Sequence, residues 1–178
     1  MFLAQARSVP GIHVVGIVEL RPEIARSNLT FVGWPKEQFS ATDLNDAVTH
    51  GTTFIGDDWP ALIKHSNIQI VVECTGNPIA AVDHCLVAFS EGKHVINVTI
   101  EADAFCGVGL AAKARAAGVI YSMAYGDQPA LTAELVDWAR ASGFNVTAAG
   151  RGHKWLPHYR KSTPDTIWGH WGLTQEQA

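Results

Sequence analysis

Short apolar runs rich in β-branched residues alternate with longer, alanine-rich amphipathic segments along most of the chain. This alternation constrains the fold most strongly, because a strand, a helix and a further strand in succession usually give parallel strand pairing. The predicted strands cover residues 13–18, 52–55, 68–74, 94–98, 119–123 and 144–149. The predicted helices cover the segment ending at residue 8, then 22–27, 59–65, 79–90, 105 or 107 to 117, and 129–142. We therefore predict an α/β fold, a Rossmann-like doubly wound parallel sheet.

Individual residues support these boundaries. Asn77 suits the cap of the helix that follows it, and Pro78 suits the first helical position. The run IQIVVEC, residues 68–74, is rich in β-branched residues, which is typical of a strand buried on both faces. Three predicted helices are each followed by a glycine, the residue favoured in the left-handed conformation at helix ends: Gly92, Gly118 and Gly143.

The amino-acid composition indicates which classes of molecule the chain is not expected to bind. The formal net charge is −4 and the chain has no basic run, so we expect no binding to nucleic acid. The apolar stretches are far shorter than the roughly 20 residues of a membrane span, and the amino terminus does not resemble an export signal. We therefore expect no membrane insertion and a cytoplasmic location. Three cysteines without a CxxC pair argue against a disulfide framework and a zinc site.

Glu19 is the first candidate for cofactor binding. It directly follows the strand in HVVGIVELRPE, where the acid of a nucleotide-binding βαβ unit binds ribose hydroxyls. A solvated turn residue is the alternative. Arg21 could instead meet a 2′-phosphate, so NAD and NADP both remain open. The glycine-rich loop that should lie about 20 residues earlier is not found, so we expect the domain to lack its first strand and that loop.

The stretch VVECTGNP is the second candidate. A predicted buried strand ends there in small residues, which allow a cofactor to approach the backbone at the start of a helix. An ordinary strand-to-helix turn with a good cap is the alternative. The candidate cofactor-binding residues are Cys74, Thr75, Gly76, Asn77 and Pro78.

Two further turns follow predicted strands at the edge where open α/β sheets bind ligands. In NVTIEAD, Glu101 could position a nicotinamide ribose or a substrate hydroxyl, whereas Asp103 is best explained as a cap of the next helix. In AYGDQPA, Gly126 permits an unusual backbone conformation near the cofactor, and Asp127 precedes a helix-starting proline. We place Asp127 near the substrate.

The segment from residue 150 onward is crowded with aromatic and basic residues and has no clear period. We therefore predict an incomplete NAD(P)-binding domain over residues 1–149 and the start of a substrate or catalytic domain over 150–178. In GRGHKW, Lys154 could bind an anionic substrate group or donate a proton to a carbonyl oxygen, so it is a candidate catalytic residue. A solvated basic turn is the alternative.

A resemblance to a known family rests on four segments: VVECTGNP, GKHVINVTIEAD, GVIYSMAYGDQPA and TAAGRGHKW. Together they resemble the amino-terminal part of homoserine dehydrogenase-like oxidoreductases with a carboxyl-terminal SAF domain, a group that includes deoxyxylulose-phosphate reductoisomerase-like enzymes. The resemblance runs from about Pro10 to Trp155. It implies an NAD(P)-dependent oxidoreductase that acts on a small hydroxy or carbonyl compound.

Members of that family also have a first strand with a GxGxxG loop and a long carboxyl-terminal region, so we expect this chain to be a fragment. In the strand order 3-2-1-4-5-6 the first strand is central. Without it we expect unpaired groups in the middle of the sheet, and either poor stability or a strand supplied from elsewhere. The alternative function is a non-catalytic nucleotide-binding or assembly module completed by a partner chain. Homo-oligomer formation remains open.

Overall fold

The computed structural model describes residues 2–126, 128–150, 156–163, 165–166 and 169. The chain divides into two compact units, Met1–Ala124 and Tyr125–Ala178. The first unit contains all of the described strands, and the second contains one long helix and a short 3-10 helix. The predicted domain boundary at residues 149 and 150 remains a prediction.

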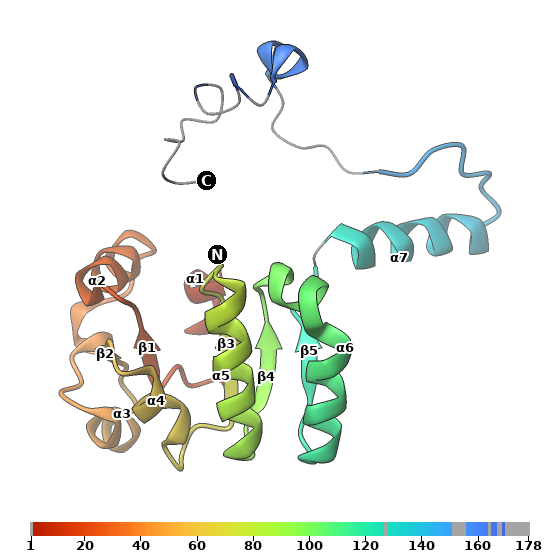
Figure 1. Cartoon of the computed structure of the whole chain (residues 1–178). Coiled ribbons are helices and arrows are strands. Elements are labelled where there is room, and N and C mark those ends of the chain that lie inside the picture. The colour runs from red at the N-terminus through yellow and green to blue at the C-terminus, as the bar shows by residue number, and fades with distance from the viewer. Residues whose placement is uncertain (1, 127, 151–155, 164, 167–168, 170–178) are drawn as a thin grey trace. The chain divides into compact units, whose positions relative to one another are not determined.

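The strands of the first unit pair in parallel, as the sequence predicts (Figure 1). One pairing joins β1 and β2 in a two-stranded ribbon, and the others join β3, β4 and β5 in that order. The ribbon aligns Ile17 with Ile55, and the larger sheet aligns Val72 with Ile96. The bounds are β1 (Gly16–Val18), β2 (Phe54–Gly56), β3 (Ile70–Glu73), β4 (His94–Asn97) and β5 (Tyr121–Met123).

No described strand joins the two sheets, since β1 and β3 belong to different ones. The order β2-β1 followed by β3-β4-β5 matches the order 3-2-1-4-5-6 with its central position left open. Among the described residues, β1 and β3 each therefore have one unpaired edge. This is the arrangement that the sequence predicts for a Rossmann-like sheet without its first strand.

The helices of the first unit lie between the strands, as expected, but some bounds differ from the prediction. The helix predicted over residues 22–27 extends to Phe31 as α2, and α3 starts at Leu44, where no helix was predicted. Helix α6 starts at Ile100 and changes direction at Cys106, where φ is −146°, so the predicted start marks only its second segment. The bounds are α1 (Phe2–Ala6), α2 (Pro22–Phe31), η1 (Lys36–Phe39), α3 (Leu44–His50), α4 (Trp59–Lys64), α5 (Pro78–Ser90) and α6 (Ile100–Ala116).

Side chains cover the β1–β2 ribbon on both faces. Ile17 and Ile55 pack with Leu29 of α2 in one apolar cluster. A Cβ placed on the neighbouring Gly16 would meet Leu62 of α4 and a leucine of α3. Because successive residues of a strand point to opposite faces, α2 covers one face, and α3 and α4 cover the other.

Within the described part of the first unit, helices cover one face of the three-stranded sheet. Val95 of β4 packs against α5 and α6, which lie over the same face of the sheet (Figure 1). The opposite face carries apolar side chains that remain partly exposed: Ile70 at 52%, Val72 at 37%, Ile96 at 36% and Ile120 at 64%. The prediction that residues 68–74 form a strand buried on both faces is therefore wrong for the described part of the chain.

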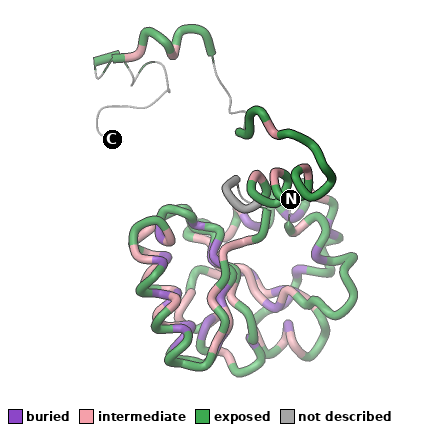
Figure 2. Tube along the Cα trace, turned by 90° about the vertical axis from the view of Figure 1, so that its right-hand side faces the viewer, coloured by how far each residue is buried: buried purple, intermediate pink, exposed green. Residues whose placement is uncertain are grey.

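The second unit consists of α7 (Gln128–Ala141), η2 (Pro157–Lys161) and extended segments. None of its described residues is classed as buried, in contrast to the first unit (Figure 2). The strand predicted over residues 144–149 does not form. Instead Phe144 folds back on α7, where its N–H donates to the carbonyl of Ala139 at 2.9 Å and its ring lies 6.3 Å from that of Trp138. No helix within the described ranges is both long and apolar enough to cross a membrane.

Candidate cofactor site

The turns after β3 and β4 contact each other at the carboxyl-terminal edge of the sheet. The N–H of Val98 donates to the carbonyl of Glu73 at 2.7 Å. The N–H of Gly76 donates to the hydroxyl of Thr99 at 3.0 Å. Both bonds join residues that are more than 20 positions apart, so two separate segments form one continuous surface.

The Thr75–Pro78 turn starts α5 as the sequence predicts. The Asn77 side chain accepts hydrogen bonds from the N–H groups of Ile79 and Ala80, each at 3.1 Å, and Pro78 is the first helical residue. Gly76 has φ of +71°, and no heavy atom lies within 4 Å of where its Cβ would be. Cys74, Thr75, Gly76 and Asn77 are exposed. The turn therefore offers backbone that a ligand can approach closely.

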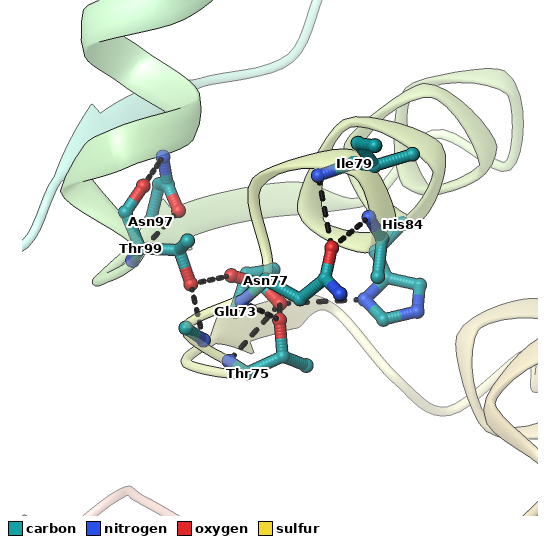
Figure 3. A network of polar contacts seen from close by, with 9 residues as sticks. Glu73, Thr75, Asn77, Ile79, His84, Asn97 and Thr99 are labelled. Carbon is teal, nitrogen blue, oxygen red and sulfur yellow. Dashed lines mark hydrogen bonds and ion pairs between the residues drawn. The ribbon is translucent and has the colours of Figure 1, made fainter. Parts of the chain in front are cut away.

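Glu73 is the buried centre of this edge, and its side chain is only 1% exposed (Figure 3). Its Oε1 accepts the Thr75 hydroxyl at 2.6 Å, the Thr75 N–H at 3.2 Å and Nδ1 of His84 at 3.3 Å. Its Oε2 accepts a short hydrogen bond from the Thr99 hydroxyl. The carboxylate thus connects β3, the following turn, helix α5 and the turn after β4.

The Glu73 carboxyl group remains ionised because its hydrogen bonds outweigh the effect of burial. Burial alone would raise its pKa, whereas the bonds from His84, Thr75 and Thr99 lower it, with a net pKa of about 2. The ring of Trp59 packs on His84 at 4.5 Å between centroids. Glu73 was not among the predicted site residues, because its partners Thr99 and His84 lie far from it in sequence.

A second group of hydrogen bonds continues from Thr99 to β5. Asn97 accepts the N–H of Thr99 and donates to the Thr99 carbonyl and to the Tyr121 hydroxyl, at 3.0 to 3.1 Å. The Tyr121 hydroxyl donates to Asp103 at 3.0 Å. Burial raises the pKa of Tyr121 well above its ordinary value, and the Asp103 carboxylate adds to this increase, whereas the bond from Asn97 opposes it. The Tyr121 hydroxyl therefore keeps its proton.

Asp103 was expected to cap a helix, and this expectation is wrong. Asp103 lies inside the first segment of α6, whose cap residue is Thr99, and it accepts the hydroxyl of Tyr121 instead. The neighbouring Glu101 is exposed in the first turn of the helix. The helix starts earlier than predicted, which moves Asp103 from the cap into the helix.

Glu19 directly follows β1, and its N–H donates to the carbonyl of Gly56 at 3.0 Å. Its carboxylate accepts the N–H of Arg21 at 3.4 Å. Partial burial of the thiol raises the pKa of Cys74, and the charges of Glu73 and Glu19 raise it further. Val15, just before β1, packs in one apolar cluster with Ile68 and with Val71 of β3, so the two strands are near each other, and Glu19 and Cys74 each follow the carboxyl end of a parallel strand.

The remaining predicted site residues belong to the second unit. Gly126 is exposed and has φ of +116°, a conformation that side-chain-bearing residues rarely adopt. Asp127 and Lys154 lie outside the described residues. Their roles remain predictions.

A nicotinamide dinucleotide needs a hydrogen-bond acceptor for its ribose and close access to protein backbone. The first unit offers the Glu19 carboxylate and the open backbone at Gly76 on one edge of parallel strands. The exposed Thr75 and Asn77 flank this glycine and add polar groups. The residues present therefore fit such a cofactor.

Comparison with known families agrees with this geometry. A sequence model of the homoserine dehydrogenase NAD-binding domain matches residues 14–124. The chain belongs to this family. A second model, the catalytic domain of oxidoreductase DRL, matches residues 126–178. None of the curated proteins compared with the chain matches it.

The two family matches confirm the predicted resemblance to homoserine dehydrogenase-like oxidoreductases. The chain is a homoserine dehydrogenase-like, NAD(P)-dependent oxidoreductase, and its cofactor is NAD or NADP. The NAD-binding match ends at residue 124, where the first compact unit also ends. The site built around Gly76 and Glu73 therefore lies within the NAD-binding part of the homoserine dehydrogenase-like chain.

Proposed function

We propose that this homoserine dehydrogenase-like protein transfers hydride between NAD or NADP and a small hydroxy or carbonyl compound. The observation that carries this proposal is the open backbone at Gly76 after the carboxyl end of β3, together with the Glu19 carboxylate after the carboxyl end of β1. Bound NAD(P) supplies the nicotinamide ring that exchanges the hydride. The chain's own residues bind and orient the dinucleotide and move the proton.

We assign the residues of the first unit to the dinucleotide. Glu19 accepts hydrogen bonds from ribose hydroxyls, whereas Arg21 pairs with a 2′-phosphate if the cofactor is NADP. The exposed turn from Cys74 to Pro78 contacts the cofactor through its backbone and small side chains. Glu101 is exposed after β4 and orients the nicotinamide ribose. A cofactor contact of Gly126 remains a prediction.

We assign two residues of the second unit to the substrate. Lys154 donates a proton to the carbonyl oxygen as hydride arrives at the carbonyl carbon, which yields the hydroxyl group. Asp127 binds a polar group of the substrate. The match of residues 126–178 to an oxidoreductase catalytic domain supports a substrate role for this part of the chain.

Titration of the purified chain with NADH and NADPH, followed by nicotinamide fluorescence, tests cofactor binding. We expect at least one of them to bind, and Glu19→Ala to weaken NADH binding about tenfold through lost ribose contacts. Arg21→Ala should weaken the binding of NADPH and leave the binding of NADH unchanged. Absence of binding by both cofactors would contradict the proposal.

The role of Lys154 is tested separately. Lys154→Ala should lower kcat by a factor of 10² to 10⁴, roughly the contribution of a general acid, with little effect on cofactor affinity. Lys113→Ala is the matched control, because Lys113 is an exposed lysine in the last turn of α6. Equal activity of the two variants would remove Lys154 from the mechanism.

The unpaired edges of β1 and β3 favour a second candidate, an assembly module that a partner chain completes. A partner strand inserted between them would continue the parallel order. Light scattering on the purified chain, combined with cofactor titration, separates the two candidates. A monomer that binds dinucleotide supports the enzyme, whereas binding only in the presence of a partner supports the module. Homo-oligomer formation, a cytoplasmic location and a SAF region in a longer protein remain predictions.

A further inference from the structure

The buried Glu73 carboxylate at the end of β3 accepts an unusually large set of hydrogen bonds. It is almost fully buried, yet it accepts hydrogen bonds from three residues in three different segments: Thr75, His84 and Thr99. Burying a charge is costly unless it is well hydrogen-bonded, so the site retains the charge through a dedicated set of donors. Packing of the core alone does not explain why this charged group is kept at a buried position.

Thr99 connects that carboxylate to the exposed turn. Its hydroxyl donates to Glu73 and at the same time accepts the N–H of Gly76 at 3.0 Å (Figure 3). Thr99 is 2% exposed, whereas Gly76 is exposed. One hydroxyl therefore links a buried charge to the backbone that a ligand would approach.

The turn has little other support. No heavy atom lies within 4 Å of the Cβ position of Gly76, and the residues from Cys74 to Asn77 are exposed. Packing does not hold Gly76 in place, so the hydrogen bonds through Thr75 and Thr99 hold it. Rigid placement of a binding turn by residues behind it lowers the entropy lost on binding.

We propose that Glu73 and Thr99 are positioning residues for the dinucleotide, because they fix the Thr75–Pro78 turn relative to the turn after β4. This inference rests on the proposed function, in which the Thr75–Pro78 turn contacts the cofactor. Neither side chain touches the cofactor itself. They act through the backbone of Gly76 and the hydroxyl of Thr75.

The test uses Thr99→Val, which keeps the shape of the side chain and removes the hydroxyl. We expect the Kd for the preferred dinucleotide, NADH or NADPH, to rise roughly tenfold, and Thr99→Ser to restore it. Amide hydrogen exchange without cofactor should show faster exchange at Gly76 in Thr99→Val and normal exchange in Thr99→Ser.

Thr53→Val is the matched control. Thr53 is also 2% exposed, and its hydroxyl donates to the carbonyl of Val14 at 2.6 Å, next to the first residue of β2 rather than at the carboxyl-terminal edge. This variant should lose stability without a change in cofactor affinity. All four proteins are compared at a temperature at which circular dichroism shows each to be folded.

The outcomes separate the two proposals. A wild-type chain that binds neither dinucleotide overturns the proposed function and this inference with it. A wild-type chain that binds, together with a Thr99→Val variant of equal affinity, overturns only the positioning role. Equal loss of affinity in Thr53→Val and Thr99→Val would show a general effect of lower stability and would also overturn it.

Discussion

The two sheets of the first unit differ in how they are covered and in what they carry at the edge. The β1–β2 ribbon is packed by helices on both faces, and Glu19 follows β1 at its carboxyl-terminal edge. The β3–β4–β5 sheet is packed on one face, and its edge contains the buried group of Glu73 and Thr99. The ribbon is held mainly by apolar contacts, whereas the larger sheet adds a polar network where the Thr75–Pro78 turn begins.

This difference shows that structural support and ligand contact need not come from the same residues. Burial of apolar surface is non-directional and does not fix the position of a turn. Hydrogen bonds to a buried charge have defined geometry and can do so. If so, the apolar clusters should dominate the free energy of unfolding of both sheets, and the polar network should add a pH-dependent part in the larger sheet alone.

The largest expected effect comes from cavities in the two apolar clusters. Leu29→Ala in the ribbon and Leu110→Ala beside the larger sheet should each lower the free energy of unfolding by about 2–5 kcal/mol. Both should shift one common transition in urea, measured by circular dichroism, because Ile68 and Val71 share a cluster with Val15 of the ribbon side. Two separate transitions would show that the sheets unfold independently.

If these variants do not fold, Ile55→Val and Ile63→Val replace them. Ile55 and Ile63 belong to one cluster each, and each substitution should lower the free energy of unfolding by about 0.5–1.5 kcal/mol. The comparison of transitions is the same.

The next effect is a pH dependence that belongs to the larger sheet. The pKa of Glu73 is about 2 in the folded chain, below its ordinary value of 4.5. A lowered pKa stabilises the fold above about pH 4.5, and this stabilisation is lost as the pH falls toward 2. The shift corresponds to about 3 kcal/mol.

Urea unfolding between pH 6 and pH 2.5 measures this contribution. In Glu73→Gln the free energy of unfolding should fall less steeply below pH 4.5 than in the wild type. Glu101→Gln is the control, because Glu101 is an exposed acid on the same side of the sheet, and its profile should follow the wild type. Parallel profiles of Glu73→Gln and wild type would contradict the role of the buried charge.

A smaller effect distinguishes the two faces of the larger sheet. Val95→Thr places a hydroxyl in the covered face and should cost about 1–3 kcal/mol. Val72→Thr places one on the exposed face and should change stability by less than about 0.5 kcal/mol. Thermal unfolding of both variants measures the difference. A similar cost for both would mean that the face carrying Val72 is covered in solution.

The smallest effect is a gain in α6. Gly109 lies inside this helix with open space at its Cβ position, so Gly109→Ala should add about 0.5–1 kcal/mol. Gly118→Ala should instead destabilise, because Gly118 has φ of +71° after the end of the helix. Opposite changes in the melting temperature support this assignment, and changes of the same sign would oppose it.

The sequence predicted the parallel α/β fold because strand and helix periods are local properties of the chain. It also located the start of α5, since Asn77 and Pro78 act within a few residues of each other. Burial of β3 on both faces was wrong because burial depends on what packs against a strand. The strand at 144–149 was wrong for a related reason, since a strand needs a partner and Phe144 contacts α7 instead.

The candidate site was predictable only in part. The turn at Gly76 and the acid Glu19 follow strands, so the rule for parallel sheets brings them to one edge. Glu73 lies in the same run but resembles any acid at a strand end. Its importance comes from Thr99 and His84, which are 26 and 11 residues away and reach it only in the folded chain.

The raised pKa of Cys74 has a consequence for handling the protein. Partial burial of its thiol, with the negative charges of Glu73 and Glu19, disfavours the thiolate form. Alkylation and oxidation proceed through the thiolate. The two acids thus also protect a surface cysteine, and we expect iodoacetamide to label Cys74 slowly at neutral pH despite its exposure.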